Sequence, residues 1–239
     1  MNNYNRIEDL LNLFNDINEV IDLYNIVSSL YSSLLLRLKP VEDMDKYDFT
    51  VDDIMDMMSS CSFGLEDQEI KTISICSDMV TKYIEPIRAL ANNNPGYIKY
   101  SEVITKNGIL IIFRSGIKLE VLGDNVSAKT ISMNIEDKIF SIILVDESDS
   151  PNINIKTQLM CHEITHYVLN EARLDLYCGG TDKDVDLFVE FICDYIGYLC
   201  VYNKSWYTNM INDIPMFNES IREDYENFID AFHKEFDNF

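Results

Sequence analysis

Residues 139–169 read IFSIILVDESDSPNINIKTQLMCHEITHYVL. The first seven form an apolar run with the length and β-branched content of a buried strand, and the edge of that strand is a candidate for pairing with an extended peptide. The polar residues 146–150 and Pro151 end the strand, and a helical pattern begins at about Ile153. The sequence therefore predicts a strand that passes through a short polar link into a helix.

This helix carries the most informative motif, Cys161-His162-Glu163-Ile164-Thr165-His166, which holds two of the three histidines in the chain. Histidines four positions apart share one face of a helix, so their rings can converge on one cation. Glu163 lies about 100° round the helix from His162, near enough to reach water bound to that cation. We expect His162 and His166 to bind zinc and Glu163 to act as general base. The alternative is a pair of ordinary core histidines.

A third zinc ligand has to come from outside this motif. The helix expected over about residues 183–204 carries Glu190 among apolar neighbours, with Asp194 four positions later on the same face. Glu190 can complete the zinc site, and Asp194 can accept the outer N–H of a ligating histidine, which fixes the tautomer of that ring. Asp184 is the competing ligand, because residues 180–184 resemble the Gly-Thr-x-x-Asp segment that supplies the third ligand in aspzincins.

Other residues near these motifs have less defined roles. Cys193 and Gly197 are small and would let the two helices approach closely. Tyr195 and Tyr198 follow Glu190 and are candidate oxyanion stabilisers, with core packing as the alternative. Cys161 is expected to pack in the core rather than to act as a redox or inhibitory ligand.

The helical pattern ends at residues 92–96, Asn-Asn-Asn-Pro-Gly, which form a dense turn signal. Short β-rich runs follow it, at residues 97–105, 109–114, 117–122, near 126–133 and at 139–145. Asn107-Gly108 and Ser115-Gly116 are expected hairpin turns. These runs predict a small, largely antiparallel sheet.

The N-terminal part of the chain reads as helix. Apolar residues recur at three–four spacing over residues 5–38, and this stripe is expected either to pack on the rest of the protein or to mediate self-association. An acidic stretch follows at residues 41–58, and a second helix is expected over 66–91, with Pro86 bending it or ending it early. The predicted organisation is an acidic helical region over 1–62, an α+β domain over 63–204 and a helical extension over 205–239.

Composition excludes several classes of protein. With 41 acidic and 19 basic side chains, the formal charge is −22, which argues against direct binding of a nucleic-acid backbone. Apolar runs are far shorter than the roughly 18 residues that a membrane span needs, and no signal peptide is evident. The six cysteines form no Cys-x-x-Cys pair. A cytoplasmic, reduced protein is therefore expected.

Three segments together resemble the ImmA/IrrE family of zinc metallopeptidases: residues 140–145, residues 162–169, and residues 190–194. The family pattern is His-Glu-x-x-His-x-x-Leu, followed by a Glu with a small residue and an Asp or Asn behind it. The resemblance covers about residues 66–204. It implies a zincin-like metallopeptidase domain, zinc bound by His162, His166 and Glu190, and Glu163 as general base.

The resemblance also bears on the substrate, because members of this family typically cleave DNA-binding repressors. The chain departs from the family in two places: its N-terminal region is acidic where many members carry a basic helix-turn-helix, and residues 205–239 have no counterpart that we can name. We expect a regulatory zinc endopeptidase acting on a basic, repressor-like protein, since opposite charges speed encounter. The alternative is an acidic, DNA-mimic-like interaction protein with a structural or vestigial zinc site.

Overall fold

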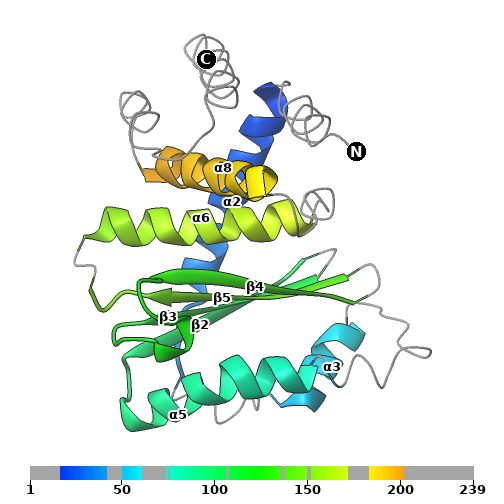
Figure 1. Cartoon of the computed structure of the whole chain (residues 1–239). Helices are drawn as coiled ribbons and strands as arrows, with labels where there is room; N and C mark the ends of the chain where they lie inside the picture. The colour runs from blue at the N-terminus through cyan, green and yellow to red at the C-terminus, as the bar shows by residue number, and fades with distance from the viewer. Residues whose placement is uncertain are drawn as a thin grey trace.

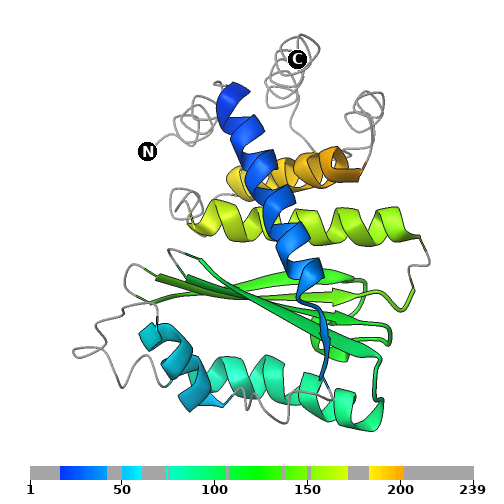
Figure 2. The ribbon, with the colours of Figure 1, turned by 180° about the vertical axis from the view of Figure 1, so that it is seen from behind.

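A five-stranded sheet separates two layers of helices in the computed structural model of the chain (Figures 1 and 2). The structure describes residues 17–41, 50–60, 74, 76–105, 108–135, 138–149, 152–171 and 183–201. The helices are α2 (Ile17–Leu36), α3 (Val51–Ser60), α5 (Glu85–Asn93), α6 (Ile153–Glu171) and α8 (Lys183–Val201). The strands are β1 (Lys39–Pro40), β2 (Ile98–Ile104), β3 (Gly108–Ser115), β4 (Ala128–Ile135) and β5 (Lys138–Asp146).

The strand order in the sheet is β1-β2-β3-β5-β4. Only β3 and β5 run parallel, in register from Gly108 opposite Ile139 to Ser115 opposite Asp146, while the other neighbours are antiparallel. These two central strands read as continuous apolar runs because helices cover both faces of the sheet. The expected α+β class with a small, mainly antiparallel sheet is confirmed.

Two predictions about the sheet are wrong. Residues 117–122 form no strand, and Ser115-Gly116 is no hairpin turn, because the chain leaves β3 for a loop that contains a 3₁₀ turn at Glu120–Leu122. The loop buries Leu119 and Leu122 and fixes the backbone of Leu119, whose N–H donates to Oδ2 of Asp146 at 2.8 Å. The second error concerns β5, which has a partner on each side and so offers no edge to a peptide. The edge strands of the described sheet are β4 and the two-residue β1.

Pro86 does not end its helix. A π-helical turn at Val80–Ile84 comes directly before it, closed by the N–H of Glu85 donating to the carbonyl oxygen of Val80. The extra residue in this turn places Pro86 in the first turn of α5, where its missing N–H leaves no intrahelical bond unmade. The helix then continues to Asn93, and its buried side packs under the sheet.

α2 crosses α6 and α8 on the side that faces the viewer in Figure 2, and it belongs to the same core. Its buried residues Leu23, Val27 and Leu34 pack with those of α6 and α8, which include Cys161 and Ile196. The stripe of α2 thus packs on the rest of the protein, as the first interpretation expects. The predicted boundaries at residues 62 and 205, and the helix expected over 5–16, lie outside the described residues. None of the described helices is long and apolar enough to cross a membrane.

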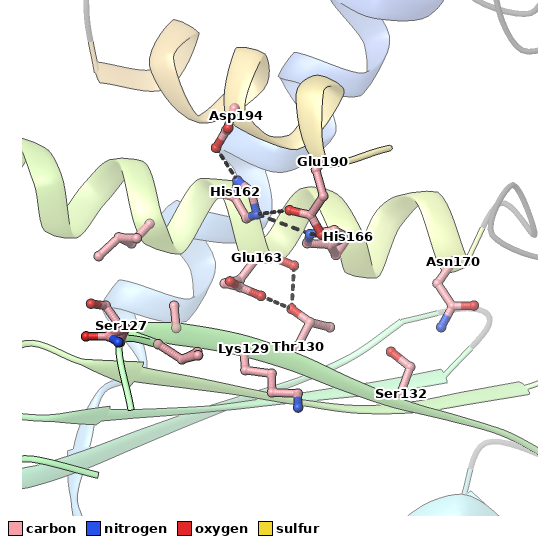
Figure 3. Close-up of a pocket in the computed structure, with 14 residues that line it drawn as sticks. Ser127, Lys129, Thr130, Ser132, His162, Glu163, His166, Asn170, Glu190 and Asp194 are labelled. Atoms are coloured by element: carbon pink, nitrogen blue, oxygen red, sulfur yellow. Dashed lines mark hydrogen bonds and ion pairs between the residues drawn. The ribbon is translucent and has the colours of Figure 1, made fainter. Parts of the chain in front are cut away.

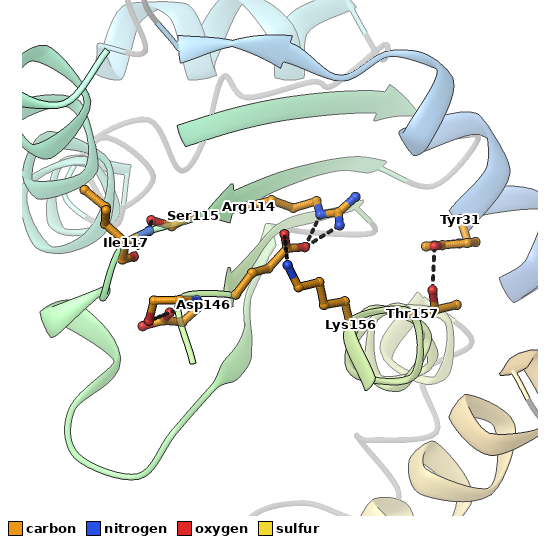
Figure 4. A network of polar contacts seen from close by, with 9 residues as sticks. Tyr31, Arg114, Ser115, Ile117, Asp146, Lys156 and Thr157 are labelled. Carbon is orange, nitrogen blue, oxygen red and sulfur yellow. Dashed lines mark hydrogen bonds and ion pairs between the residues drawn. The ribbon is translucent and has the colours of Figure 1, made fainter. Parts of the chain in front are cut away.

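Polar contacts fix the start of α6, the helix that carries the histidine motif (Figure 4). Glu147, just after β5, pairs with Arg114 of β3 and lies 3.5 Å from Nζ of Lys156 in the first turns of α6. The hydroxyls of Tyr31 in α2 and Thr157 in α6 are hydrogen-bonded at 3.0 Å. Both links are partly buried, so they constrain where α6 begins relative to the sheet and to α2.

Candidate metal centre

The structure brings His162, His166 and Glu190 together (Figure 3). The Nε2 atoms of the two histidines lie 3.1 Å apart. Oε2 of Glu190 lies 3.3 Å from Nε2 of His162, and Oε1 of Glu190 lies 3.3 Å from Nε2 of His166. These ligand atoms all lie within 4.8 Å of one another. Two ligands at zinc–ligand lengths of about 2.0–2.1 Å and a tetrahedral angle are separated by roughly 3.3–3.4 Å. The spacing and the donor types therefore fit a zinc ion.

Asp194 contacts His162 on the side of the ring that faces away from the cluster. Its Oδ1 lies 2.7 Å from Nδ1 of His162, one turn of α8 beyond Glu190. With Nδ1–H donating to the carboxylate, Nε2 keeps its lone pair and faces the ligand cluster. This is the contact that the shared face of Glu190 and Asp194 predicts. Asp184, the competing third ligand, lies in the first turn of α8, and its side chain is outside what the structure describes.

The carboxylates change the protonation of the site. Burial lowers the pKa of His162, but hydrogen bonds with Asp194 and Glu190 outweigh burial and raise that pKa to about 10. Hydrogen bonds from His162 and His166 hold the pKa of the Glu190 carboxyl well below its usual range. Without metal, the cluster is thus an ion pair that keeps a proton on His162 at neutral pH.

Glu163 lies beside the cluster with only 6% of its surface exposed. Thr130 of β4 donates its hydroxyl hydrogen to Oε2 of Glu163 at 2.7 Å, and the same hydroxyl lies 2.9 Å from the main-chain oxygen of Glu163. This contact fixes the carboxylate against the sheet and aligns β4 with α6. Nothing in the sequence around Thr130 marks it as a functional residue, because its role depends on which face of β4 points toward α6.

A cavity of about 600 Å³ opens between α6 and β4 and contains the ligand cluster. Its walls include Leu159, His162, Glu163, His166 and Asn170 of α6, and Ala128, Lys129, Thr130 and Ser132 of β4. Glu190 and Asp194 close one side from α8. A group of three ligands next to an open cavity leaves room for a further ligand and for a substrate.

No protein-family model matches the chain, and neither a curated protein nor a solved structure is significantly similar to it. A function therefore has to be inferred from the geometry of its own residues.

The close crossing of α6 and α8 depends on small residues, as the sequence predicts. A Cβ atom on Gly197 would lie 2.9 Å from the main-chain oxygen of Gln158 and 3.4 Å from the main-chain nitrogen of His162. Cys193 is fully buried in the same contact region. Cys161 is also fully buried and packs in the core, as expected.

The structure does not bring Tyr195 or Tyr198 to the cavity. Tyr195 has no exposed surface and belongs to the core between the helices, and Tyr198 packs against that core. Both rings are more stable there because burial of a large aromatic surface outweighs exposure of a hydroxyl to the site. Neither residue is among those that line the cavity, so the described residues include no tyrosine placed to stabilise an oxyanion.

Proposed function

We propose that this protein is a zinc-dependent endopeptidase with a zincin-like domain of the ImmA/IrrE kind. His162, His166 and Glu190 would hold the zinc, and Glu163 would be the general base. The observation that carries the proposal is the convergence of three ligand atoms within 4.8 Å, next to a buried carboxylate and an open cavity.

Each side chain has a defined task in peptide hydrolysis. Zinc held here supplies a Lewis acid that lowers the pKa of water toward neutrality. Glu163 accepts the proton of the attacking water at one carboxylate oxygen and passes it to the leaving amine. Thr130 holds the other oxygen of that carboxylate. Asp194 keeps the ring of His162 turned so that Nε2 faces the cluster.

The surroundings of the site support a peptide substrate. β4 is an edge strand of the described sheet and also lines the cavity, so an extended segment can pair with its free main-chain groups beside Glu163. The charge of −22 favours a basic partner such as a repressor. The proposed setting is the cytoplasm.

The alternative, an acidic interaction protein with a structural zinc, agrees less well with this geometry. Structural zinc sites are closed by four protein ligands, whereas the described cluster has three and opens into a cavity. The alternative also gives no role to the carboxylate of Glu163. A partner whose binding survives chelation and Glu163→Gln would favour it.

Metal content and proteolysis test the proposal together. The purified protein should bind one zinc, and His162→Ala should lose it. Glu163→Gln should keep the zinc and lose cleavage of an extended peptide mixture by about 10²–10⁴-fold, the usual contribution of a general base. Equal cleavage by wild type and Glu163→Gln would remove the proposal.

A further inference from the structure

Asn170 continues the ligand stripe of α6, four residues after His166 and eight after His162. It lines the cavity with only 7% of its surface exposed. A side-chain amide offers two donors and an acceptor, so a ligand that enters the cavity can form hydrogen bonds with it.

A second polar residue, Ser132, lies at the same end of the cavity as Asn170. Figure 3 shows Asn170 and Ser132 on the same side of His166, at the end of the cavity away from Ser127. Ser132 is exposed on β4, with its hydroxyl 2.7 Å from that of Ser141. A carboxamide and a hydroxyl each offer donor and acceptor atoms, so this end suits an uncharged hydrogen-bonding group.

The opposite end holds apolar side chains together with polar ones. Leu159 of α6 and Val126 and Ala128 on the strand side line it, as do Asn125 and Ser127. Val126 keeps 40% of its surface exposed. Leu159, Val126 and Ala128 therefore give this end a surface that an apolar side chain can contact.

The distances between the two ends match an extended peptide. With a rise of about 1.5 Å per helical residue, Asn170 lies about 6 Å beyond His166 along α6, and Leu159 lies about 4.5 Å before His162. An extended chain advances about 3.3 Å per residue. A peptide bond placed midway between the two histidines is therefore about 9 Å, or about three extended residues, from Asn170. It is about 7.5 Å, or about two residues, from Leu159 on the other side.

We propose that the cavity is a two-ended peptide site that selects substrates by sequence. Asn170 and Ser132 bind an amide or hydroxyl side chain about three residues to one side of the scissile bond, and Leu159 and Val126 bind an apolar side chain about two residues to the other side. Acidic side chains are disfavoured, because Glu163, Glu190 and Asp194 line the cavity and Lys129 is the only lysine or arginine among its described lining residues. This selectivity rests on the proposed peptidase function.

Binding to an inert variant separates selectivity from catalysis. Zinc-loaded Glu163→Gln is incubated with a random peptide library, and the bound peptides are sequenced. We expect one position enriched in Asn, Gln, Ser or Thr and a second, roughly five residues away, enriched in apolar residues. Adding Asn170→Leu should weaken the first preference by roughly tenfold, the effect of one unpaired hydrogen-bonding group, and leave the second unchanged.

Two further variants guard against a change in fold. Asn170→Asp keeps the shape of the side chain and should shift the first preference toward basic residues. Asn154→Leu, at an exposed position on the same helix, should leave both preferences and the zinc content unchanged. If Asn170→Leu no longer binds zinc, the library profile of Asn170→Asp is the one that tests the role of Asn170.

The outcomes distinguish the two proposals. Identical profiles with and without Asn170, or no enrichment at all, would overturn the two-ended site. Enrichment as expected, with no cleavage of the bound peptides by the zinc-loaded wild type, would overturn the peptidase function and support the peptide site. Cleavage by the wild type without preference at the Asn170 position would overturn the selectivity alone.

Discussion

Asp194 and Glu190 contact opposite nitrogens of a single imidazole. Oδ1 of Asp194 lies 2.7 Å from Nδ1 of His162, and Oε2 of Glu190 lies 3.3 Å from its Nε2. Both carboxylates come from one face of α8, four residues apart, so one helix fixes both the tilt of the ring and the side that faces the cluster. The ligand geometry is therefore set by helix packing before any metal binds.

Asp194→Ala should weaken zinc binding by about 10–100-fold, because the ring of His162 loses the partner that fixes its tautomer. The side chain of Asp194 is 51% exposed, so the fold should survive the change. Competition with a chromophoric chelator measures the affinity. Asp194→Asn keeps an acceptor without the charge, so its zinc affinity should lie between those of wild type and Asp194→Ala. Unchanged affinity in Asp194→Ala would show that Asp194 does not orient the ligand.

Zinc binding at pH 7 should release about one proton from His162. The pKa of this residue is raised to about 10, so the metal-free protein keeps the proton at pH 7 and loses it only as pH rises through about 10. A ligating imidazole has to be neutral, so zinc displaces the proton, and the apparent affinity rises with pH up to about 10. Calorimetry in buffers of different ionisation enthalpy counts the protons.

The control for this measurement is Asp194→Ala. It removes one of the hydrogen bonds that raise the pKa of His162, so fewer protons should be released at pH 7. Zinc binding to wild type at pH 7 without proton release would contradict the prediction.

Thr130→Val should lower kcat by roughly tenfold while zinc content stays the same. The variant keeps the shape of the side chain but leaves Oε2 of Glu163 without its 2.7 Å partner, so the base is less well oriented. Thr130→Ser, which keeps the hydroxyl, should recover most of the rate. A kcat that is equal in Thr130→Val and wild type would mean that Glu163 is held by its packing alone.

The sequence predicts the central strands well and the loop between them poorly. Residues 109–114 and 139–145 are apolar runs whose burial on both faces requires no knowledge of the rest of the fold. Residues 117–122 look similar, but Leu119 is tied to Asp146, which is 27 residues away in the chain. A local pattern carries no information about such a partner, nor about the parallel pairing of β3 with β5.

Some residues of the candidate site can likewise be predicted from local spacing, and others cannot. His162, Glu163 and His166 lie within about one turn, so their spacing alone predicts that they converge. Thr130 could not be found this way, because its contact depends on the pairing of β4 with β5. Asn170 could have been found by extending the i+4 stripe of the two histidines by one more turn.

Gly197→Ala should destabilise the protein by about 1–3 kcal/mol, the usual effect of adding a methyl group to a tightly packed site. The new Cβ would lie 2.9 Å from the main-chain oxygen of Gln158, and a backbone atom cannot swing away, so α6 and α8 would have to separate. The separation would also move Glu190 and Asp194 away from His162. We therefore expect weaker zinc binding together with a lower urea midpoint of the metal-free protein.

Helix propensity acts in the opposite direction, which makes the sign of this experiment decisive. Alanine is favoured over glycine inside a helix by about 0.8–1.0 kcal/mol, so Gly197→Ala would stabilise α8 if the crossing could adapt. Ser29→Ala and Ser29→Gly, at an exposed position of α2, together measure the gain of alanine over glycine without a packing cost. A Gly197→Ala protein that gains as much stability over wild type as Ser29→Ala gains over Ser29→Gly, and that binds zinc normally, would show that the two helices do not need this close approach to build the site.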